Sequence, residues 1–486
     1  MQINKKWVTG ILIALLMLLI NVGHVNAASD TSLKDVKDKG TLVLGTSPDY
    51  PPYEFQTTVN GNDKIVGFDI SIARKIAKDI GVKLVIKKMD FDSLLVGLET
   101  HKIDMVISGM NPSDDRKKSI DFSDVYYNGK QMMLVNKADK DKYKKLNDFS
   151  GLSVGAQTGS LQYSMSKEQI NNVDIKGLAK VTDLILALKS GKVTGVAMEE
   201  PTAKAYAQND SSLAVVDPGF VSAADARGAA VGFAKKSDTL VAAANKSIKE
   251  IKDKDLINKT YLPEASNYLT KNTADNTMIH YWKYFAKGIG YTLLITAISV
   301  VVGVILGTLL ALMRLGKNKI IKVIAVSYIE FVRGTPLMIQ VMFVYFGIGM
   351  IVNVPALLAG IIAVSLNSGA YIAEVIRSGI GSIDDGQMEA ARSLGLSQKE
   401  TYKSVIIPQA LKNIWPALGN EFITLIKESS IVSIIGVTDL IYQMKMVQSA
   451  TYKGIAPIFV AMVLYFVLTF SLSKLLNYFE GKMKHV

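Results

Sequence analysis

Hydrophobic and polar positions divide the chain into two stretches of different pattern. Up to about residue 265, short apolar runs such as "TLVLGT" (41–46) and "KIDMVISG" (102–109) alternate with helical patterns such as "DISIARKIAKDIG" (69–81). This alternation is typical of an α/β fold. No run in this stretch is long enough to cross a bilayer. The pattern therefore predicts a soluble α/β domain over residues 28–265.

Residues 286–486 are dominated by long apolar runs, which predict an all-α membrane domain. The run "GIGYTLLITAISVVVGVILGTLLALM" (288–313) is uncharged for 26 residues, and about 20 apolar residues suffice to cross a bilayer. A polar linker at 266–285 joins the two domains. Five spans would place the two ends of the membrane domain on opposite sides. The other four are expected at about 320–351, 354–378, 414–438 and 455–473.

An internal similarity suggests that the α/β domain has two lobes. The segment "LLVGLETHKIDMVIS" (94–108) matches "LILALKSGKVTGVAM" (184–198) in apolar phase without gaps. Each predicts a helix, a polar turn and a buried strand. Any two helix–turn–strand units look alike, but both of these strands run directly into charged or polar residues. Ligands of open α/β sheets bind beyond the carboxyl ends of strands.

The N-terminus has the layout of a secretory signal, which is expected over residues 1–27. Lys5 and Lys6 precede an apolar run from Val8 to Ile20, and the small residue Ala27 marks the cleavage site. An uncleaved anchor helix is the alternative. In either case the α/β domain is exported.

Basic residues indicate the orientation of the membrane domain. Arg314 and Lys319 follow the first predicted span, and Lys474 and Lys482 follow the last. Basic loops face the cytoplasm. The sequence therefore predicts a multi-pass protein of the cell membrane with the α/β domain outside, and the loop 379–413 and the C-terminus in the cytoplasm.

Composition excludes several kinds of chemistry. The 486 residues include no cysteine and four histidines, and the histidines are too far apart in sequence for metal-ligand spacing. The net charge is +12, but no basic stretch is interleaved with aromatics, which argues against nucleic-acid binding. No Gly-Lys pair is followed by Ser or Thr, so the chain lacks a P-loop. We predict no metal site, no bound cofactor and no catalytic residue.

The charged segment "EAARSLGLSQKETYKSVIIPQA" (389–410) lies between two apolar spans. A short amphipathic helix there, broken at Gly395, would either lie on lipid or dock into a groove of a partner. The segment resembles the EAA loop of ABC importer permeases, and the neighbouring segments "YIEFVRGTPLMIQ" (328–340), "NSGAYIAEVIRSGI" (367–380) and "ITLIKESSIVS" (423–433) resemble the polar amino-acid branch of that family. The likeness covers about 280–480.

This resemblance implies a partner that supplies the energy. In the family, the loop inserts into a cleft on a separate cytoplasmic ATPase dimer, which carries ATP and Mg. The permease itself dimerises, so a homodimer is expected. Glu421 and Glu428 lie on an otherwise apolar predicted span, and such groups usually face a pathway or a partner, which makes them candidates for the translocation path. The coupling residues implied are Glu389, Ala390, Ala391, Gly395 and Pro408.

The α/β domain offers groups suited to a free amino acid, whose carboxylate favours an arginine and whose ammonium favours a carboxylate. Arg116 follows one strand and its turn, and Glu199 follows the similar strand. The segments "SPDYPPYEF" (47–55), "VGFDISIARKIA" (66–77) and "SGMNPSDDR" (108–116) resemble the polar amino-acid family of bilobed solute-binding proteins of type II, over about 38–262. By this resemblance, Arg116 binds the ligand carboxylate and Glu199 the ammonium. Tyr50 and Phe68 sandwich the ligand, Ser108, Gly109 and Asn111 line the first lobe, and Thr158 and Gly159 line the second.

The combined patterns predict a receptor fused to a permease subunit of an ATP-driven importer for polar amino acids, and not an enzyme. Ser47, Gly155 and Glu199 depart from relatives that read the ligand side chain, so the cargo is expected to be a polar amino acid that is uncharged or basic. Two alternatives share the bilobed domain. A ligand-gated channel would need spans within that domain and a pore filter, and a dehydratase-like enzyme would need a general acid or base in the cleft, a role open to Glu199.

Overall fold

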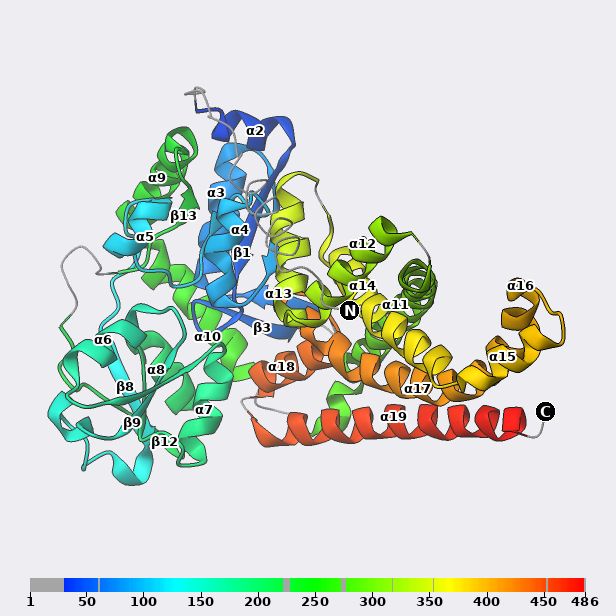
Figure 1. The fold of residues 1–486 in the computed structure, drawn as a ribbon. Coiled ribbons are helices and arrows are strands. Elements are labelled where there is room, and N and C mark those ends of the chain that lie inside the picture. The colour runs from blue at the N-terminus through cyan, green and yellow to red at the C-terminus, as the bar shows by residue number, and fades with distance from the viewer. Residues whose placement is uncertain are drawn as a thin grey trace.

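The computed structural model describes residues 30–59, 62–221, 228–271, 277–316, 318–352, 354–451 and 453–484. The predicted signal at 1–27 lies outside these ranges. Figure 1 shows two lobes of strands and helices beside a membrane half made of helices, as the α/β and all-α patterns predict. The predicted fold class is confirmed.

Lobe 1 is built on a five-stranded sheet in the order β5-β1-β6-β13-β7. β1 pairs in parallel with β5 and β6, while β13 is antiparallel to β6 and β7. The apolar face of α3 packs on this sheet through Ile70, Ile72 and Ile76, which are fully buried. The strands are β1 (Thr41–Thr46), β5 (Lys83–Lys88), β6 (Met105–Val106), β7 (Ile120–Phe122) and β13 (Gly232–Ala234). The helices are α2 (Ser32–Asp38), α3 (Phe68–Ile80), α4 (Leu94–Glu99), α5 (Asp114–Ser119) and α9 (Asp238–Asp253).

Lobe 2 repeats this arrangement with the order β10-β9-β11-β8-β12. The two similar segments of the sequence occupy equivalent places: α4 leads into β6 beside β1, and α7 leads into β11 beside β9. The predicted internal repeat is therefore confirmed. The strands are β8 (Gln131–Asn136), β9 (Ser153–Gln157), β10 (Asp174–Leu178), β11 (Gly195–Glu199) and β12 (Leu213–Val216). The helices are α6 (Leu161–Gln169), α7 (Val181–Lys189) and α8 (Glu200–Asn209).

A small antiparallel sheet, β2 (Asp49–Tyr50), β3 (Glu54–Val59) and β4 (Asn62–Val66), lies next to the junction of the lobes. Gly67 joins β4 to α3 at φ +127°, and a Cβ there would lie 2.0 Å from the carbonyl oxygen of Tyr53. Only glycine fits this approach without displacing backbone.

The membrane half contains three helices that are long and apolar enough to cross a bilayer, among the described residues: Met278–Leu315, Ala356–Gly381 and Ile455–Tyr478. They correspond to the predicted first, third and fifth spans. The predicted second span is instead a bent pair, Lys319–Arg333 and Leu337–Met350, at 106° to each other. Gly334 and Pro336 stand at the bend, and proline disfavours a helical conformation in the residue before it.

The predicted fourth span differs from the others. α17 (Ile407–Glu428) carries Lys412, Glu421, Lys427 and Glu428, which is why it does not reach the apolar character of the other three spans. The short helices η10 (Ser429–Ile435) and α18 (Leu440–Thr451) follow it. The remaining elements are α11 (Trp282–Leu315), α12 (Lys319–Arg333), α13 (Leu337–Met342), η7 (Phe343–Gly347), η8 (Ile348–Met350), α14 (Ala356–Gly381), α15 (Asp385–Ser393), α16 (Gln398–Thr401), η9 (Tyr402–Ile406) and α19 (Ile455–Lys484).

The expected polar linker at 266–285 is largely helical where the structure describes it. α10 (Leu262–Lys271) continues past residue 266, and α11 begins at Trp282 after a single 3-10 turn, η6 (Met278–Tyr281). Ala265 and Leu269 of α10 are buried against a cluster that includes Phe55. A helix with an apolar face gains more from packing than an extended linker does, which explains the difference.

Candidate functional site

A cleft between the two lobes is lined by four of the nine predicted ligand residues. Its free volume is about 10 Å³, which is room for about one water molecule, so the two lobes are closed on each other in this structure. Of the predicted residues, Tyr50, Ser108, Gly109 and Asn111 line it. Lobe 1 also supplies Ser47, Asp49, Glu54 and Phe91, and lobe 2 supplies Gln157, Ser160 and Gln162.

Arg116 lies at the edge of this cleft and reaches from one lobe to the other. Its Nη1 donates to the carbonyl oxygen of Asn111 at 2.7 Å, and its Nη2 donates to the carbonyl oxygen of Gly159 in lobe 2 at 2.8 Å. The guanidinium also lies over the ring of Phe91, 5.5 Å from its centroid. Burial lowers the pKa of Arg116 to about 10, so the group stays charged at neutral pH and is poised for an anion.

Glu199 ends β11 in lobe 2 and is fully buried. Its Oε1 accepts hydrogen bonds from Asn111 Nδ2 at 3.1 Å and Gln131 Nε2 at 3.4 Å, and its Oε2 accepts one from the Tyr53 hydroxyl. Burial raises the pKa of Glu199, while these three donors oppose the rise. Asn111 thus contacts Arg116 through its backbone and Glu199 through its side chain.

The aromatic residues divide differently from the prediction. Phe68 is fully buried in the core of lobe 1, with its ring 4.3 Å from that of Tyr53 and 5.3 Å from that of Tyr127, and it does not line the cleft. Its predicted role as one face of the ligand sandwich stays a prediction. Phe91 lines the cleft, as does Tyr50, whose ring lies beside Gly109. The signal that sequence reasoning missed was the position of Phe91 directly after β5, in the segment "MDF" (89–91).

Two buried carboxyl groups, Glu54 in the lining of the cleft and Asp69 behind it, lie close together. Glu54 accepts from Ser108 Oγ at 2.7 Å, and Asp69 accepts from the backbone N–H of Gly109 at 2.8 Å. Burial raises the pKa of Asp69 to about 7, and burial with the neighbouring Asp69 raises the pKa of Glu54 well above its usual range. These groups hold the Ser108–Gly109 turn against the cleft.

The second lobe contributes the end of β9 and the start of α6. Gly159 adopts φ +74° and presents its carbonyl to Arg116, whereas Thr158 is exposed and does not line the cleft. Ser160 caps α6, since its Oγ accepts from the N–H of Tyr163 at 3.2 Å. Gln162 donates to Gln131 at 2.7 Å. The end of β9 and the start of α6 therefore line the cleft through Gln157 and Ser160, while Gly159 contacts Arg116.

In the membrane half, the predicted coupling segment forms a helical hairpin at the end far from the binding lobes (Figure 1). α15 ends at Ser393 and Gly395 follows at φ +85°, with the N–H of Leu396 donating to the carbonyl of Ala391. Glu389 and Ala390 are exposed, Ala391 is buried, and Leu394 is 84% exposed. Pro408 stands in the first turn of α17.

The two candidate path residues, Glu421 and Glu428, lie seven residues apart on α17 and hence on one face of it. Glu421 is partly buried and Glu428 exposed. Among the described residues, no group of three or more His, Cys, Asp or Glu side chains is arranged to hold a metal ion.

Comparison with known proteins finds two family matches that meet end to end. Residues 42–263 match the bacterial extracellular solute-binding proteins, family 3, and residues 269–485 match the binding-protein-dependent transport system inner membrane component. The chain is 40% identical over 202 residues to a putative glutamine transport system permease protein of Rickettsia felis, covering 41% of this chain and 93% of that protein. It is 40% identical over 203 residues to an arginine transport system permease protein of Bacillus subtilis, again covering 41% and 93%. It is 34% identical over 255 residues to an arginine-binding extracellular protein of Bacillus subtilis, covering 51% and 93%.

Proposed function

This chain belongs to two families at once, the family 3 solute-binding proteins and the inner-membrane components of binding-protein-dependent transport systems. From this premise we infer how the chain binds and transports its cargo. The chain is the fused binding protein and permease of an amino-acid ABC transporter. The proposal concerns how the chain holds its cargo, which cargo it takes and what drives it.

The cargo is held by its two charged backbone groups. Arg116 binds the α-carboxylate, because its guanidinium is buried, charged and aimed across the cleft. Glu199 binds the α-ammonium from the other lobe. The observation that carries this assignment is the linkage of both groups through Asn111, at 2.7 Å and 3.1 Å. Opposite charges that contact the same residue complement the two charged groups of a zwitterion.

The side chain of the cargo is polar and either uncharged or basic. Asp49 and Glu54 line the cleft, and Gln157 and Gln162 add amide groups. Asp49 and Asp90 outnumber Lys180, so this side of the cleft keeps a net negative charge that would repel an acidic side chain, whereas a guanidinium or amide finds oxygen acceptors there. The relatives named for arginine and for glutamine support the same class.

Calorimetric titration of the purified full chain with each of the twenty amino acids tests the cargo assignment. We expect saturable binding of L-arginine, L-glutamine or a small set of similar amino acids, and no binding of L-glutamate or L-leucine. Binding of L-leucine alone would contradict the proposed lining, and binding of L-glutamate would contradict the charge argument.

Transport is driven by a separate ATPase dimer that docks on α15 and α16 in the cytoplasm, and the permease half works as a homodimer. The exposed Leu394 at the tip of the hairpin supports docking, since a lone apolar side chain at a polar tip suits insertion into a groove. The hairpin and the binding lobes lie at opposite ends of the membrane half, which supports an extracellular binding domain. Protease protection in right-side-out vesicles would test this orientation, with cleavage near residues 394–400 expected only in permeabilised vesicles.

A further inference from the structure

Both lobes of the binding domain rest on the membrane half. Lys102 of lobe 1 donates to the carbonyl oxygen of Val354 at 3.4 Å and lies over the ring of Tyr345, 5.2 Å from its centroid. In lobe 2, a Cβ added to Gly454 would lie 2.6 Å from Leu186 Cδ1, so these two segments are in close contact. α18 lies beside the junction of the two lobes, near β3 and α7 (Figure 1), and its Ser449 Oγ donates to the carbonyl oxygen of Pro48 in lobe 1 at 3.4 Å.

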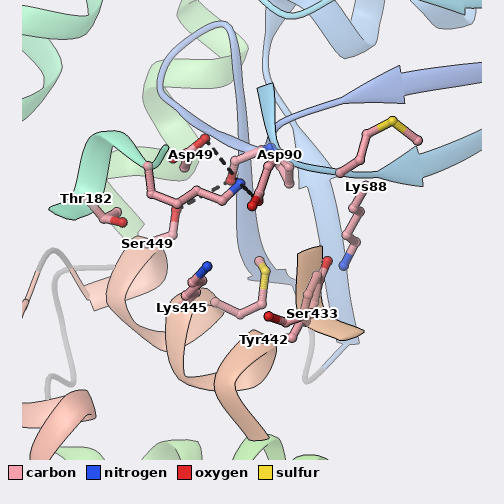
Figure 2. A pocket seen from close by; sticks show the side chains of 12 residues that line it. Asp49, Lys88, Asp90, Thr182, Ser433, Tyr442, Lys445 and Ser449 are labelled. Atoms are coloured by element: carbon pink, nitrogen blue, oxygen red, sulfur yellow. Dashed lines mark hydrogen bonds and ion pairs between the residues drawn. The ribbon is translucent and has the colours of Figure 1, made fainter. Parts of the chain in front are cut away.

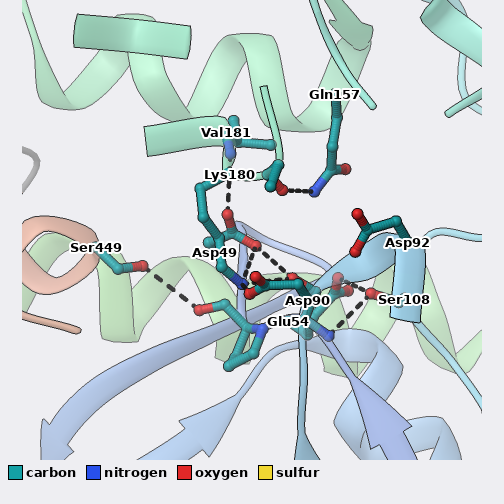
Figure 3. A network of polar contacts seen from close by, with 12 residues as sticks. Asp49, Glu54, Asp90, Asp92, Ser108, Gln157, Lys180, Val181 and Ser449 are labelled. Atoms are coloured by element: carbon teal, nitrogen blue, oxygen red, sulfur yellow. Dashed lines mark hydrogen bonds and ion pairs between the residues drawn. The ribbon is translucent and has the colours of Figure 1, made fainter. Parts of the chain in front are cut away.

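A polar network closes this seam, as Figure 3 shows. Lys180 of lobe 2 contacts Asp90 of lobe 1 at 2.9 Å and donates to Ser47 Oγ at 3.0 Å, with Asp49 Oδ1 at 4.0 Å. Asp49 Oδ2 also accepts from the backbone N–H of Val181 in lobe 2 at 2.9 Å. Burial alone would lower the pKa of Lys180, but Asp49 and Asp90 raise it above its usual value. The network therefore joins the lobes through a buried ammonium between two carboxylates.

This network separates two cavities. Ser47 and Asp49 line the cargo cleft on one side. Asp49, Asp90 and Lys180 line a second cavity on the other side, with a free volume of about 30 Å³. Its opposite wall is formed by Ser433, Tyr442, Lys445 and Ser449 of the membrane half. Because Asp49 belongs to both linings, the network is the wall between the cleft and the membrane half.

One cation of the membrane half faces this wall. Figure 2 shows Lys445 rising from α18 toward the side of the cavity that holds Asp49 and Asp90. No ion pair of Lys445 occurs among the described residues, although its charge acts on Asp183 at the start of α7. Lys445 is thus a second ammonium close to the carboxylates that hold Lys180.

We propose that Lys180, Asp49 and Asp90 form a latch across the permease-facing mouth of the cargo cleft. Lys445 opens this latch by pairing with Asp90 and Asp49 in place of Lys180. Exchange of one ammonium for another keeps the carboxylates paired, which avoids the high cost of leaving a buried charge alone. The lobes then separate above α18 and the cargo leaves toward the permease. The role of this latch in cargo release rests on the proposed function, in which the cleft holds the amino acid.

Release of labelled L-arginine from the full chain in lipid nanodiscs is the first test, with labelled L-glutamine as second probe. Lys180→Ala should speed dissociation at least about tenfold, because truncating one partner of a buried charge pair acts mainly on the dissociation rate. Lys180→Arg should retain most of the slow release. Lys189→Ala is the matched control, since this lysine of the same lobe pairs with Asp210 and is far more exposed, and it should leave the rate unchanged.

Lys445→Ala tests the release step, because its effect on dissociation should require an intact latch. Alone, it should slow dissociation about threefold or more, and in the Lys180→Ala background it should have no further effect, because residues that act on one contact are not additive. Unchanged dissociation in Lys180→Ala would overturn the latch. If Lys445→Ala slowed dissociation equally in the wild-type and Lys180→Ala backgrounds, the proposal that Lys445 opens the latch would be wrong.

A readout without cargo separates this inference from the proposed function. The chain has no cysteine, so spin labels at Asp115→Cys in lobe 1 and Glu168→Cys in lobe 2 report the lobe distance alone. With no amino acid added, Lys180→Ala should shift the distances toward longer values and Lys189→Ala should not. If the chain binds neither probe while this shift occurs, the cargo assignment fails and the latch stands. If a probe binds and the distances do not change, the latch fails.

Discussion

The guanidinium of Arg116 in lobe 1 donates to the carbonyl oxygen of Gly159 in lobe 2 at 2.8 Å. A single side chain thereby joins the two lobes at the place where a ligand carboxylate is proposed to bind. Gly159 is held at φ +74°, a conformation that favours glycine and that turns its carbonyl toward the cleft. A bound carboxylate would accept the same donors, so ligand binding and lobe closure use one group.

Replacement of Arg116 by alanine should reduce amino-acid affinity at least about 100-fold, because two charge-assisted hydrogen bonds contribute about 1.5–3 kcal/mol each. Calorimetric titration of the full chain measures this. Arg74→Ala removes an exposed arginine of the same lobe and should bind normally. Unaltered affinity in Arg116→Ala would place the carboxylate site elsewhere.

Glu199 and Glu200 are adjacent but differ in surroundings, which makes them a matched pair. Glu199→Gln should weaken binding by roughly 10- to 100-fold, since the ammonium of the cargo loses a charged acceptor worth about 1.5–3 kcal/mol. Glu200 pairs with Lys204 on α8. The Glu200→Gln variant should therefore bind the amino acid with wild-type affinity. Equal loss in both variants would point to a disturbed α8 instead of a lost ligand contact.

The stability of the binding domain should fall as pH rises from about 4 to about 7. Burial raises the pKa of Asp69 from 3.8 to about 7, so the folded state holds a proton that the unfolded chain releases. The stabilisation is complete below the unfolded pKa and is lost as pH rises through the folded pKa. Thermal unfolding at pH 5 and pH 8 should show the higher midpoint at pH 5. In Asp69→Asn this difference should shrink, and a larger difference would contradict the assignment.

Gly67→Ala should be among the most destabilising single changes in lobe 1. The added Cβ would approach the backbone oxygen of Tyr53 to 2.0 Å, and overpacking together with a positive φ costs about 3 kcal/mol or more. Gly81→Ala is the control, because it shares a positive φ but has open space around the Cβ, and it should cost only about 1–2 kcal/mol. Differential scanning fluorimetry measures the midpoint of thermal unfolding of both variants. Equal decreases would show that the backbone near Tyr53 moves and relieves the close contact.

The tip of the α15–α16 hairpin, which is proposed to dock on a separate ATPase, should be needed for transport and not for binding. Leu394→Asp should abolish uptake of labelled amino acid in cells that contain the proposed ATPase partner, while affinity for the cargo remains. Gly395→Val should act similarly, because valine does not readily adopt φ +85°. Lys399→Ala, an exposed change on the neighbouring α16, should transport normally. Full uptake in Leu394→Asp would remove the tip from the docking surface.

Sequence alone determined the features that depend on a few consecutive residues. The 3.6-residue spacing of apolar side chains specified α3, the uncharged run specified α11, and Gly395 ended α15. The two similar helix–turn–strand units predicted two lobes, and strand ends pointed to Arg116 and Glu199. These features are local because helix and strand patterns repeat within one or two turns.

Tertiary packing decided which of these side chains meet. Phe68 and Phe91 are both aromatic, but packing gives them different places. The packing of α3 on its sheet buries Phe68 in the core of lobe 1, whereas Phe91 lines the cleft. The 106° bend of the second span and the burial of α10 likewise depend on neighbours far away in sequence. The seam at Lys180 forms only when lobe 1 and lobe 2 come together, and the cavity beside it forms only when α18 joins them. Contacts of this kind depend on the relative placement of whole elements, which a local pattern does not encode.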